Sequence, residues 1–382
     1  MIPFKAPSIA AIAAQLPPAR PSTEELISAT RDRLSGPLIS MLSNLGVEHR
    51  HSVVGNYGDV LVGRARPRIQ ITGTELASRA ARRCLEHAYG TSGAMRSIGL
   101  VLGVSTAPGR LLPSLACDLL AHLPQIPRTA ATLSISYMGC SALAKAVDTA
   151  RWFLTCHPDQ QVLVVFLDVV TPLSPPFARH CVHFAEGDAS TRQATVDVMH
   201  GFLFGDAAVA ILLEADGPGP RFGQVTHLTN ERAQDAELGV VPDGGSDIPL
   251  VHGRRAYLLS PDVPQRGRHY ASLATRTLLQ RGDCPIEKPA QASTLLLHTG
   301  SKKILDALCA EFAVHADSEQ VACSYRTLRE YGNTIGCSVP LILADPAGQP
   351  AGHALIVAFG LSFAAGATTL QIPPGGWTPA HT

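Results

Sequence analysis

The stretch LSISYMGCSALAKAVDTARWFL, residues 133–154, decides the fold class. A short β-prone run comes first, Gly139 permits a sharp turn, and a helical pattern of apolar residues begins directly after Cys140. The same order of strand and helix recurs at 97–123, and the run QVLVVFLDVV at 161–170 is apolar almost throughout. Such strands are buried on both faces, which is typical of sheets covered by helices on both sides. The sequence therefore predicts a layered α/β protein.

The bulk composition narrows the class of partners. The chain has 382 residues, 46% of them hydrophobic, and can bury a large core. Its 31 basic and 31 acidic residues balance, which argues against nucleic acid or an anionic membrane as a partner. The nine cysteines are odd in number and none are spaced as CxxC, so we expect free thiols in a reducing compartment and no zinc site. The N-terminal segment MIPFKAPSIAAIAAQLPPARP lacks the features of a secretory signal, and we expect a cytoplasmic chain.

One segment has the composition of a membrane span. Residues 354–372 are nearly free of charge and numerous enough to cross a bilayer. The glycines at positions 360 and 366 divide the segment into two short runs. This pattern favours two adjacent buried strands over a membrane helix.

Two motifs in the first half of the chain have similar counterparts in the second half. A Gly-, Pro- and Asp-rich composition begins near residue 216, where we expect a boundary between two halves, 1–215 and 216–382. YMGCSALAKA in the first half has a counterpart in TIGCSVPLIL in the second, and FLFGDAAVAILLE has one in VAFGLSFAAGATTL. An internal duplication would bring the two helix starts face to face across a pseudo-twofold axis.

Three residues occupy positions that suit catalysis. Cys140 precedes a helix, whose unpaired amides and positive dipole end favour a thiolate. His298 closes the strand TLLLH and is expected at the carboxyl edge of the sheet, where α/β proteins gather their sites. Asn333 follows a glycine at another helix start. Each has an ordinary alternative: the cysteine and histidine as packed core residues, and the asparagine as a helix N-cap. Cys337 is expected to pack.

The order of the motifs resembles a known family. MGCSA, FLFGDAAVAILLE, LLLHTGSKKILDAL, REYGNTIGCSVPLIL and VAFGLSFAAG follow one another as in the type III polyketide synthases, the chalcone synthase-like branch of the thiolase superfamily. That superfamily also contains condensing enzymes of the ketoacyl-acyl carrier protein synthase III type. The resemblance covers nearly the whole chain. It implies a five-layered α-β-α-β-α sandwich built from two duplicated halves, and a homodimer.

The resemblance also implies a chemistry. The family's catalytic cysteine, histidine and asparagine correspond to Cys140, His298 and Asn333. Cys140 would take an acyl group from a thioester, and the enolate of a malonyl or β-ketoacyl unit would attack that acyl-enzyme in a Claisen condensation. His298 and Asn333 would donate hydrogen bonds to the enolate oxygen, and His298 would also help to hold Cys140 as a thiolate. The substrates would be thioesters on coenzyme A or acyl carrier protein, with no permanently bound cofactor and no metal. The implied setting is polyketide or related secondary-metabolite biosynthesis, such as that of antibiotics.

Two departures from the family concern the surroundings of the nucleophile and the carrier. The segment GCSALAKA lacks the small glycine pair of the family, so Leu143 or Lys145 is expected to narrow or re-aim the site. The segment SGPLISMLSNLGVEHRH, where the family binds the phosphates of coenzyme A, contains no lysine and a single arginine near its end. A weakly held coenzyme A, or a different carrier, follows from this departure.

Two further departures concern loops. His298 lies 158 residues after Cys140, and we expect the excess length as an inserted loop within 172–201. Phe184 in that loop is a candidate for the aromatic side chain that guards the acyl pocket, with ordinary loop packing as the alternative. The closing segment AFGLSFAAG stands where the family has a glycine-rich turn.

The departures leave other functions open. A related ketosynthase joins two carrier-bound β-ketoacyl chains into an α-pyrone, without decarboxylation. A Cys-dependent O- or N-acyltransferase would use the acyl-enzyme but no enolate, so it would tolerate Asn333→Ala better than a condensing enzyme. A non-catalytic partner of an active paralogue would need none of the three residues, and their joint presence argues against it.

Overall fold

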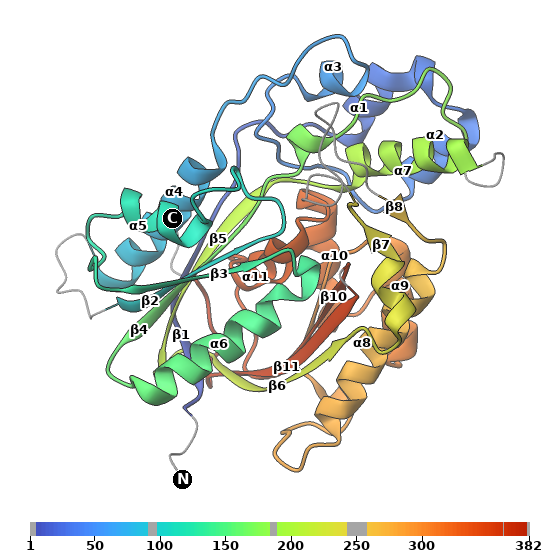
Figure 1. The fold of residues 1–382 in the computed structure, drawn as a ribbon. Coiled ribbons are helices and arrows are strands. Elements are labelled where there is room, and N and C mark those ends of the chain that lie inside the picture. The colour runs from blue at the N-terminus through green and yellow to red at the C-terminus, as the bar shows by residue number, and fades with distance from the viewer. Residues whose placement is uncertain (1–4, 91–97, 184–188, 243–257, 362, 380–382) are drawn as a thin grey trace.

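The computed structural model describes residues 5–90, 98–183, 189–242, 258–361 and 363–379. The described strands form one nine-stranded mixed sheet in the order β3-β2-β4-β5-β1-β6-β11-β10-β9 (Figure 1). Its strands are β1 (Pro7–Gln15), β2 (Ile98–Ser105), β3 (Ala131–Ser136), β4 (Gln161–Asp168), β5 (Ala207–Ala215), β6 (Arg221–Thr229), β9 (Thr294–Leu297), β10 (Gly352–Gly360) and β11 (Ala364–Ile372). A separate ribbon pairs β7 (Gly239–Val240) with β8 (Leu258–Leu259).

The sheet has an internal symmetry. From β2 to β1 the neighbouring strands pair first parallel and then twice antiparallel, and from β9 to β6 the same sequence of pairings repeats. The two halves meet where Ser8 of β1 pairs with Arg221 of β6. This arrangement is what an internal duplication predicts. The boundary expected near residue 216 falls between β5 and β6, and the division into domains stays a prediction.

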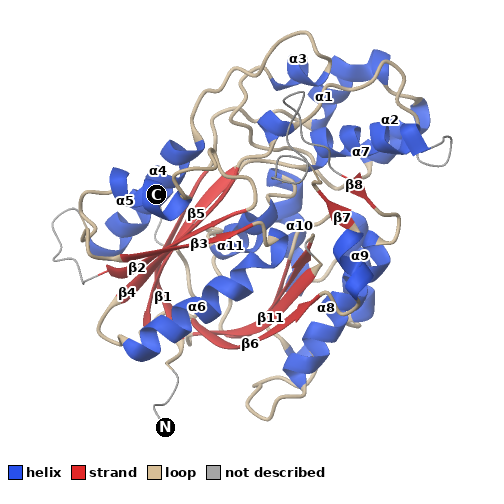
Figure 2. Ribbon diagram, viewed as in Figure 1, coloured by secondary structure: helices blue, strands red, loops and turns tan. Residues whose placement is uncertain are grey.

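Helices cover both half-sheets and also lie between them (Figure 2). The outer helices of the first half are α4 (Gly73–Tyr89) and α5 (Leu115–His122), and those of the second half are α8 (Val263–Leu279), α9 (Lys302–Glu311) and α10 (Glu319–Tyr331). The central helices are α6 (Ala142–Cys156) and α11 (Ser338–Leu343). The predicted α/β class, with its α-β-α-β-α layers, is therefore confirmed.

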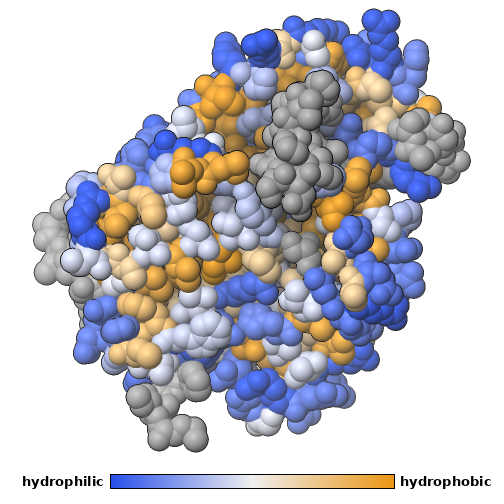
Figure 3. Space-filling view, viewed as in Figure 1, coloured by the Kyte–Doolittle hydropathy of each residue, from blue (hydrophilic) through white to orange (hydrophobic). Residues whose placement is uncertain are grey.

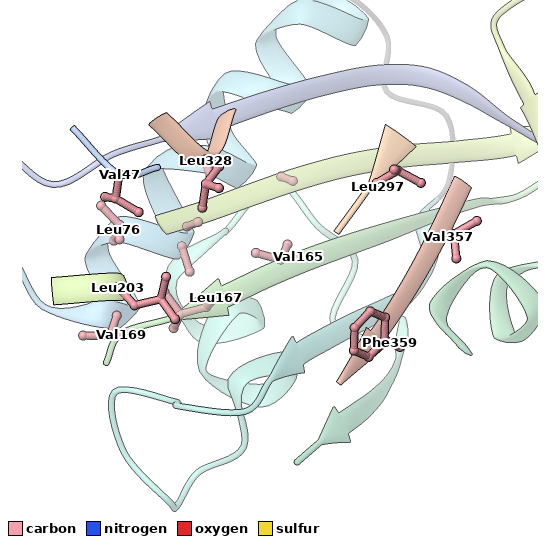
Figure 4. Close-up of a cluster of buried hydrophobic side chains, with 14 of the residues drawn as sticks. Val47, Leu76, Val165, Leu167, Val169, Leu203, Leu297, Leu328, Val357 and Phe359 are labelled. Atoms are coloured by element: carbon pink, nitrogen blue, oxygen red, sulfur yellow. The ribbon is translucent and has the colours of Figure 1, made fainter. Parts of the chain in front are cut away.

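Alternation along the strands explains the layers. In β4, Leu163, Val165 and Leu167 belong to the core beneath the outer helices. Their neighbours Val162, Val164 and Phe166 belong to the core around α6 and α11. Because successive side chains of a strand point to opposite faces, an uninterrupted apolar run serves two cores at once. Figure 4 shows part of the first core, including Val165 and Leu167.

The segment 172–201, where an inserted loop was predicted, lies in the long connection from β4 to β5. This connection contains α7 (Ala189–Leu203), whereas the equivalent strands β10 and β11 are joined by residues 361–363 alone. The connection packs against the segment that holds α1 (Thr23–Thr30), α2 (Gly36–Ser43) and α3 (Tyr57–Leu61), and Figure 1 shows them together at one end of the molecule. Phe184 lies outside the described residues.

The apolar segment 354–372 forms the antiparallel pair β10–β11, as predicted, and both strands are buried. Among the residues that the structure describes, none of the helices has both the length and the apolar character that crossing a bilayer requires. Within the same residues, no cluster of His, Cys, Asp and Glu could hold a metal ion.

Candidate active site

Cys140 lies on a tight turn between β3 and α6. Tyr137 and Gly139 have φ values of 60° and 57°, so the chain reverses in the left-handed region before the 3₁₀ turn Gly139–Ser141. A β-carbon added at Gly139 would lie 2.8 Å from the carbonyl oxygen of Leu361. Glycine is therefore required at position 139 by both its backbone conformation and its surroundings. The turn holds the thiol at the start of α6, as the sequence predicted.

The end of β10 lies directly against the nucleophile. A β-carbon added at Gly360 would lie 2.7 Å from the backbone nitrogen of Cys140 and 3.0 Å from its Sγ. Both distances are shorter than ordinary van der Waals contact, so only glycine fits without a displacement. Backbone from the second half of the chain thus borders the thiol of the first.

His298 follows β9 and is almost fully buried, with 2% of its surface exposed. Its backbone N–H donates to the carbonyl of Val357, and its ring meets the ring of Phe359 edge-on at 6.4 Å between centroids. Burial lowers the pKa of His298 to about 3, because the surroundings disfavour the charged imidazolium. Its Nδ1 finds no hydrogen-bond partner among the residues that the structure describes. The ring is therefore neutral at physiological pH and retains hydrogen-bonding capacity.

Asn333 lies in a second turn, the one that leads through the 3₁₀ turn Ile335–Cys337 into α11, and backbone hydrogen bonds hold it there. Its backbone N–H donates to Leu203 and its carbonyl accepts from Gly205, at 2.9 and 3.2 Å. Its side-chain oxygen accepts from the N–H of Ile335 at 2.9 Å, while its side-chain nitrogen lies 3.5 Å from the carbonyl of Gly300. The N-cap of the turn Ile335–Cys337 is Thr334, so Asn333 precedes the cap and its oxygen closes a local turn two residues long. The amide nitrogen faces the carbonyl of Gly300, two residues after His298, and acts there as a hydrogen-bond donor.

Contacts connect the three predicted residues. Gly300 joins Asn333 to the segment of His298, Phe359 joins His298 to the end of β10, and Gly360 adjoins Cys140. The turn before α6, which contains Gly139, also contacts the equivalent turn before α11, which contains Gly336. A β-carbon added at Gly336 would lie 3.6 Å from the carbonyl oxygen of Gly139. Cys337 is fully buried and donates to the carbonyl of Ala207, so its location agrees with the expected packing role.

The ionisation of Cys140 differs from the sequence-based expectation. Burial, and then the negative charge of Asp168, raise the pKa of the Cys140 thiol. The neutral ring of His298 supplies no positive charge to oppose this shift. The free site therefore holds a thiol rather than the predicted thiolate, because desolvation outweighs the field of a helix start.

The structure shows where the residues lie that depart from the family pattern, both after the nucleophile and in the segment 35–51. Leu143 packs in the core around α6 and α11, and Lys145 is half-buried. Arg50, the only arginine of the segment 35–51, is fully buried and donates to the carbonyl of Phe202 and the hydroxyl of Thr23. Burial lowers the pKa of Arg50 to about 10. This arginine is therefore not on the surface, where a coenzyme A phosphate would need it.

Asp168, the last residue of β4, is a site residue that was not predicted from the sequence. It is 1% exposed and accepts hydrogen bonds from the backbone of two other segments beside the site. The signal was present, because Asp168 is the only charged residue in an otherwise apolar run. Gly360 was quoted only as a strand divider, and its contact with Cys140 joins residues 220 positions apart, given that 360 − 140 = 220.

No family model matches the chain. The beta-ketoacyl acyl-carrier-protein synthase III of Oleidesulfovibrio alaskensis is 27% identical over 314 residues, covering 78% of this chain and 84% of that protein. The type III polyketide synthase domain of Steely1 from Dictyostelium has a TM-score of 0.75 at 16% identity, covering 96% of this chain and 99% of that one. The 3-oxoacyl-(acyl carrier protein) synthase III of Pseudomonas aeruginosa has a TM-score of 0.70 at 19% identity, covering 97% and 99%.

The chain is similar in sequence and in fold to condensing enzymes of the thiolase superfamily. The predicted resemblance is therefore confirmed, as is the predicted enzyme class of acyltransferase, which the curated relatives support. These relatives also support a ketosynthase, an enzyme that forms carbon–carbon bonds. The roles of the individual site residues and the substrates remain predictions.

Proposed function

We propose that the chain is a ketosynthase that forms a carbon–carbon bond by Claisen condensation through an acyl-enzyme on Cys140. The observation that supports this most is that contacts connect the half-buried Cys140 to two neutral hydrogen-bonding side chains, those of His298 and Asn333. Malonyl or β-ketoacyl thioesters are the proposed substrates, on coenzyme A or a carrier protein. The setting we propose is polyketide or related secondary-metabolite biosynthesis, in line with the printed name of the Steely1 domain, whose fold is similar.

The proposed reaction has two stages. In the first, the sulfur of Cys140 attacks the thioester carbonyl, and the carrier's thiol leaves with the proton that Cys140 gives up. In the second, a malonyl unit loses carbon dioxide, and the electrons of the broken C–C bond move onto the thioester oxygen as an enolate. The enolate carbon then attacks the acyl carbonyl, the C–S bond breaks, and Cys140 leaves as a thiolate that takes a proton from solvent to restore the thiol.

Neutral donors suit the second stage. The enolate oxygen carries its charge only during the reaction, so N–H groups of His298 and Asn333 would stabilise it more than they stabilise the bound substrate. An imidazole with a pKa of about 3 remains such a donor across the physiological pH range. Asn333 is pre-oriented, because its oxygen is already occupied by the N–H of Ile335.

The Asn333→Ala variant separates condensation from simple acyl transfer. Loss of one enolate donor should cost about 3 kcal/mol and lower the condensation rate about 10²-fold, while acyl loading of Cys140 changes by less than about threefold. Loading is followed by intact-protein mass spectrometry and condensation by product formation, with Asn44→Ala, at an exposed helix end, as the control. Equal activity of wild type and Asn333→Ala would favour the acyltransferase alternative.

A basic groove favours a carrier protein over free coenzyme A. Arg268, His269 and Arg276 of α8 line it together with Ser272, and Glu311 of α9 is its acidic member. Arg268 and Arg276 are exposed, and α8 contacts the site, since a β-carbon at Gly267 would lie 2.2 Å from the ring of Phe359. The groove thus offers positive charge, on a helix that packs against Phe359, to a carrier with an acidic surface. A ketosynthase for carrier-bound β-ketoacyl chains is the second candidate function.

Charge reversal in this groove tests the carrier. We expect the double variant Arg268→Glu, Arg276→Glu to lower kcat/KM for carrier-bound substrate about tenfold or more at low salt, and to leave the coenzyme A thioester unaffected. The matched control is Arg64→Glu, Arg128→Glu, which changes the net charge equally at two exposed positions elsewhere. An equal loss with both substrates, or the same loss in the control, would remove the groove from the proposal.

We further propose a homodimer that forms along the edge strand β3. Three successive residues of β3, Ala131 to Leu133, are exposed, with Leu133 at 47% and Tyr137 beyond the strand at 49%. Figure 3 shows hydrophobic side chains on the face of the molecule that carries β3. An exposed apolar sheet edge is a template for pairing with a second strand. Light scattering should give twice the 40.3 kDa of one chain, and Leu133→Lys should shift it toward the monomer. A monomeric wild type at micromolar concentration would refute the dimer.

A further inference from the structure

A chain of hydrogen bonds runs from the turn of Cys140 to the end of β4. The backbone N–H of Gly139, next to the nucleophile, donates to Oγ1 of Thr106 at 3.0 Å. The backbone N–H of Thr106 donates in turn to Oδ1 of Asp168 at 2.8 Å, and the N–H of Ala107 donates to the same oxygen at 2.9 Å. Oδ1 of Asp168 is thereby linked, through Thr106, to the turn that carries Cys140.

The other carboxylate oxygen serves the second turn. Oδ2 of Asp168 accepts from the N–H of Gly336 at 2.8 Å. Gly336 follows Ile335, whose own N–H orients the side chain of Asn333. Ile335 has a φ of 53°, a conformation that a β-branched residue avoids unless its surroundings enforce it. The bond from Gly336 to Asp168 is one of the contacts that hold this turn in place.

We propose that Asp168 is a positioning residue that ties the turn of Cys140 to the turn of Asn333 and so sets the spacing between nucleophile and enolate donor. The inference rests on the proposed function for its catalytic meaning. The geometry behind it is independent of that function: the acceptor belongs to β4, and its donors come from the segment after β2 and from the turn before α11. Burial raises the pKa of Asp168 to about 7, and these N–H groups oppose the shift. An asparagine in its place would offer one acceptor oxygen instead of two.

Substitution of Asp168 should affect the two stages of the reaction differently. Acyl loading uses the turn of Cys140 alone, whereas condensation needs the acylated thiol and Asn333 in register. A misplacement of about 1 Å costs about 10²-fold in rate. We therefore expect Asp168→Asn to lower the condensation rate about 10²-fold relative to the loading rate. A merely structural role would lower both together with the melting temperature.

Hydrogen exchange tests the link without any substrate. Peptides that contain Gly139 and Gly336 are followed by mass spectrometry in wild type, Asp168→Asn, Thr106→Val and Thr106→Ser. We expect exchange about tenfold faster in both peptides for Asp168→Asn, and in the Gly139 peptide alone for Thr106→Val. Thr106→Ser keeps the hydroxyl and should restore the wild-type pattern. Ser105→Ala is the matched control, because the hydroxyl of Ser105 is buried without a partner.

The outcomes distinguish the two proposals. If wild type condenses no thioester but exchange remains coupled as expected, the link stands and the proposed function fails. If wild type is active and Asp168→Asn matches it in condensation and in exchange, the positioning role is overturned. If Asp168→Asn does not fold, Thr106→Val still decides: unchanged exchange in the Gly139 peptide, with unchanged condensation, overturns the role as well.

Discussion

Replacement of Cys140 by serine is expected to abolish the acyl-enzyme and to lower condensation by a factor on the order of 10⁴ to 10⁶. Serine keeps the shape of the side chain, but its alkoxide is a poorer leaving group than a thiolate, and a condensing enzyme must release its nucleophile after each bond is formed. The measurement is intact-protein mass spectrometry after incubation with acyl and β-ketoacyl thioesters, on coenzyme A and on carrier protein. An adduct in wild type that is absent from Cys140→Ser establishes the nucleophile.

The control is Cys117→Ser. Cys117 is exposed, and hydrogen bonds from Ser114 and Thr132 lower the pKa of its thiol, so non-enzymatic acylation should favour it. Adducts that vanish in Cys117→Ser but persist in Cys140→Ser would show chemistry unrelated to the site. The absence of adducts from every donor in wild type would support the non-catalytic partner alternative.

Replacement of Gly360 by alanine is expected to lower both loading and condensation about 10³-fold. The added β-carbon would lie 2.7 Å from the nitrogen and 2.9 Å from the Cβ of Cys140, and neither a backbone atom nor a Cβ can yield without moving the turn. Displacement of the thiol costs about 10²-fold for 1 Å, and a moved turn also misplaces the backbone N–H of Cys140, which we propose as a donor to the developing oxyanion. Single-turnover loading rates measure the effect.

Gly282→Ala provides the comparison for Gly360→Ala. Nothing lies within 4 Å of a β-carbon at Gly282, so this variant should keep wild-type loading and a wild-type melting temperature. Near-normal loading by Gly360→Ala would mean that the end of β10 does not shape the site. Loss of folding in Gly360→Ala would be recognised by its melting temperature and would leave Cys140→Ser as the decisive variant.

Several features of the fold could be predicted because they depend on local patterns. The uninterrupted apolar run of β4 indicated a strand buried on both faces, and the glycines within 354–372 indicated two strands rather than a membrane helix. Gly139 indicated the sharp turn before α6. The segment 172–201, where the long spacing from Cys140 to His298 indicated an inserted loop, lies in the connection between β4 and β5, and the insertion relative to the family stays a prediction. Each of these signals is encoded within a few residues.

The ionisation of the site could not be predicted in the same way. The helix start of Cys140 favours a thiolate, yet burial and Asp168 raise its pKa, and burial keeps His298 neutral. The sequence showed Arg50 as the single arginine of the segment where the family binds coenzyme A phosphates, and only the fold shows that it is buried and donates to the carbonyl of Phe202. Desolvation depends on every residue packed around a group, and no sequence window contains them all.

The sequence by itself determined the elements, the layered class and the three candidate residues, because hydrophobic period, glycine turns and motif order are properties of short segments. Only the tertiary structure decided that Gly360 borders Cys140, that Asp168 joins the two turns, and that the imidazole of His298 is uncharged. The reason is physical: these contacts join strands from both halves of the chain, and their energies arise from burial and from hydrogen bonds between residues far apart in sequence.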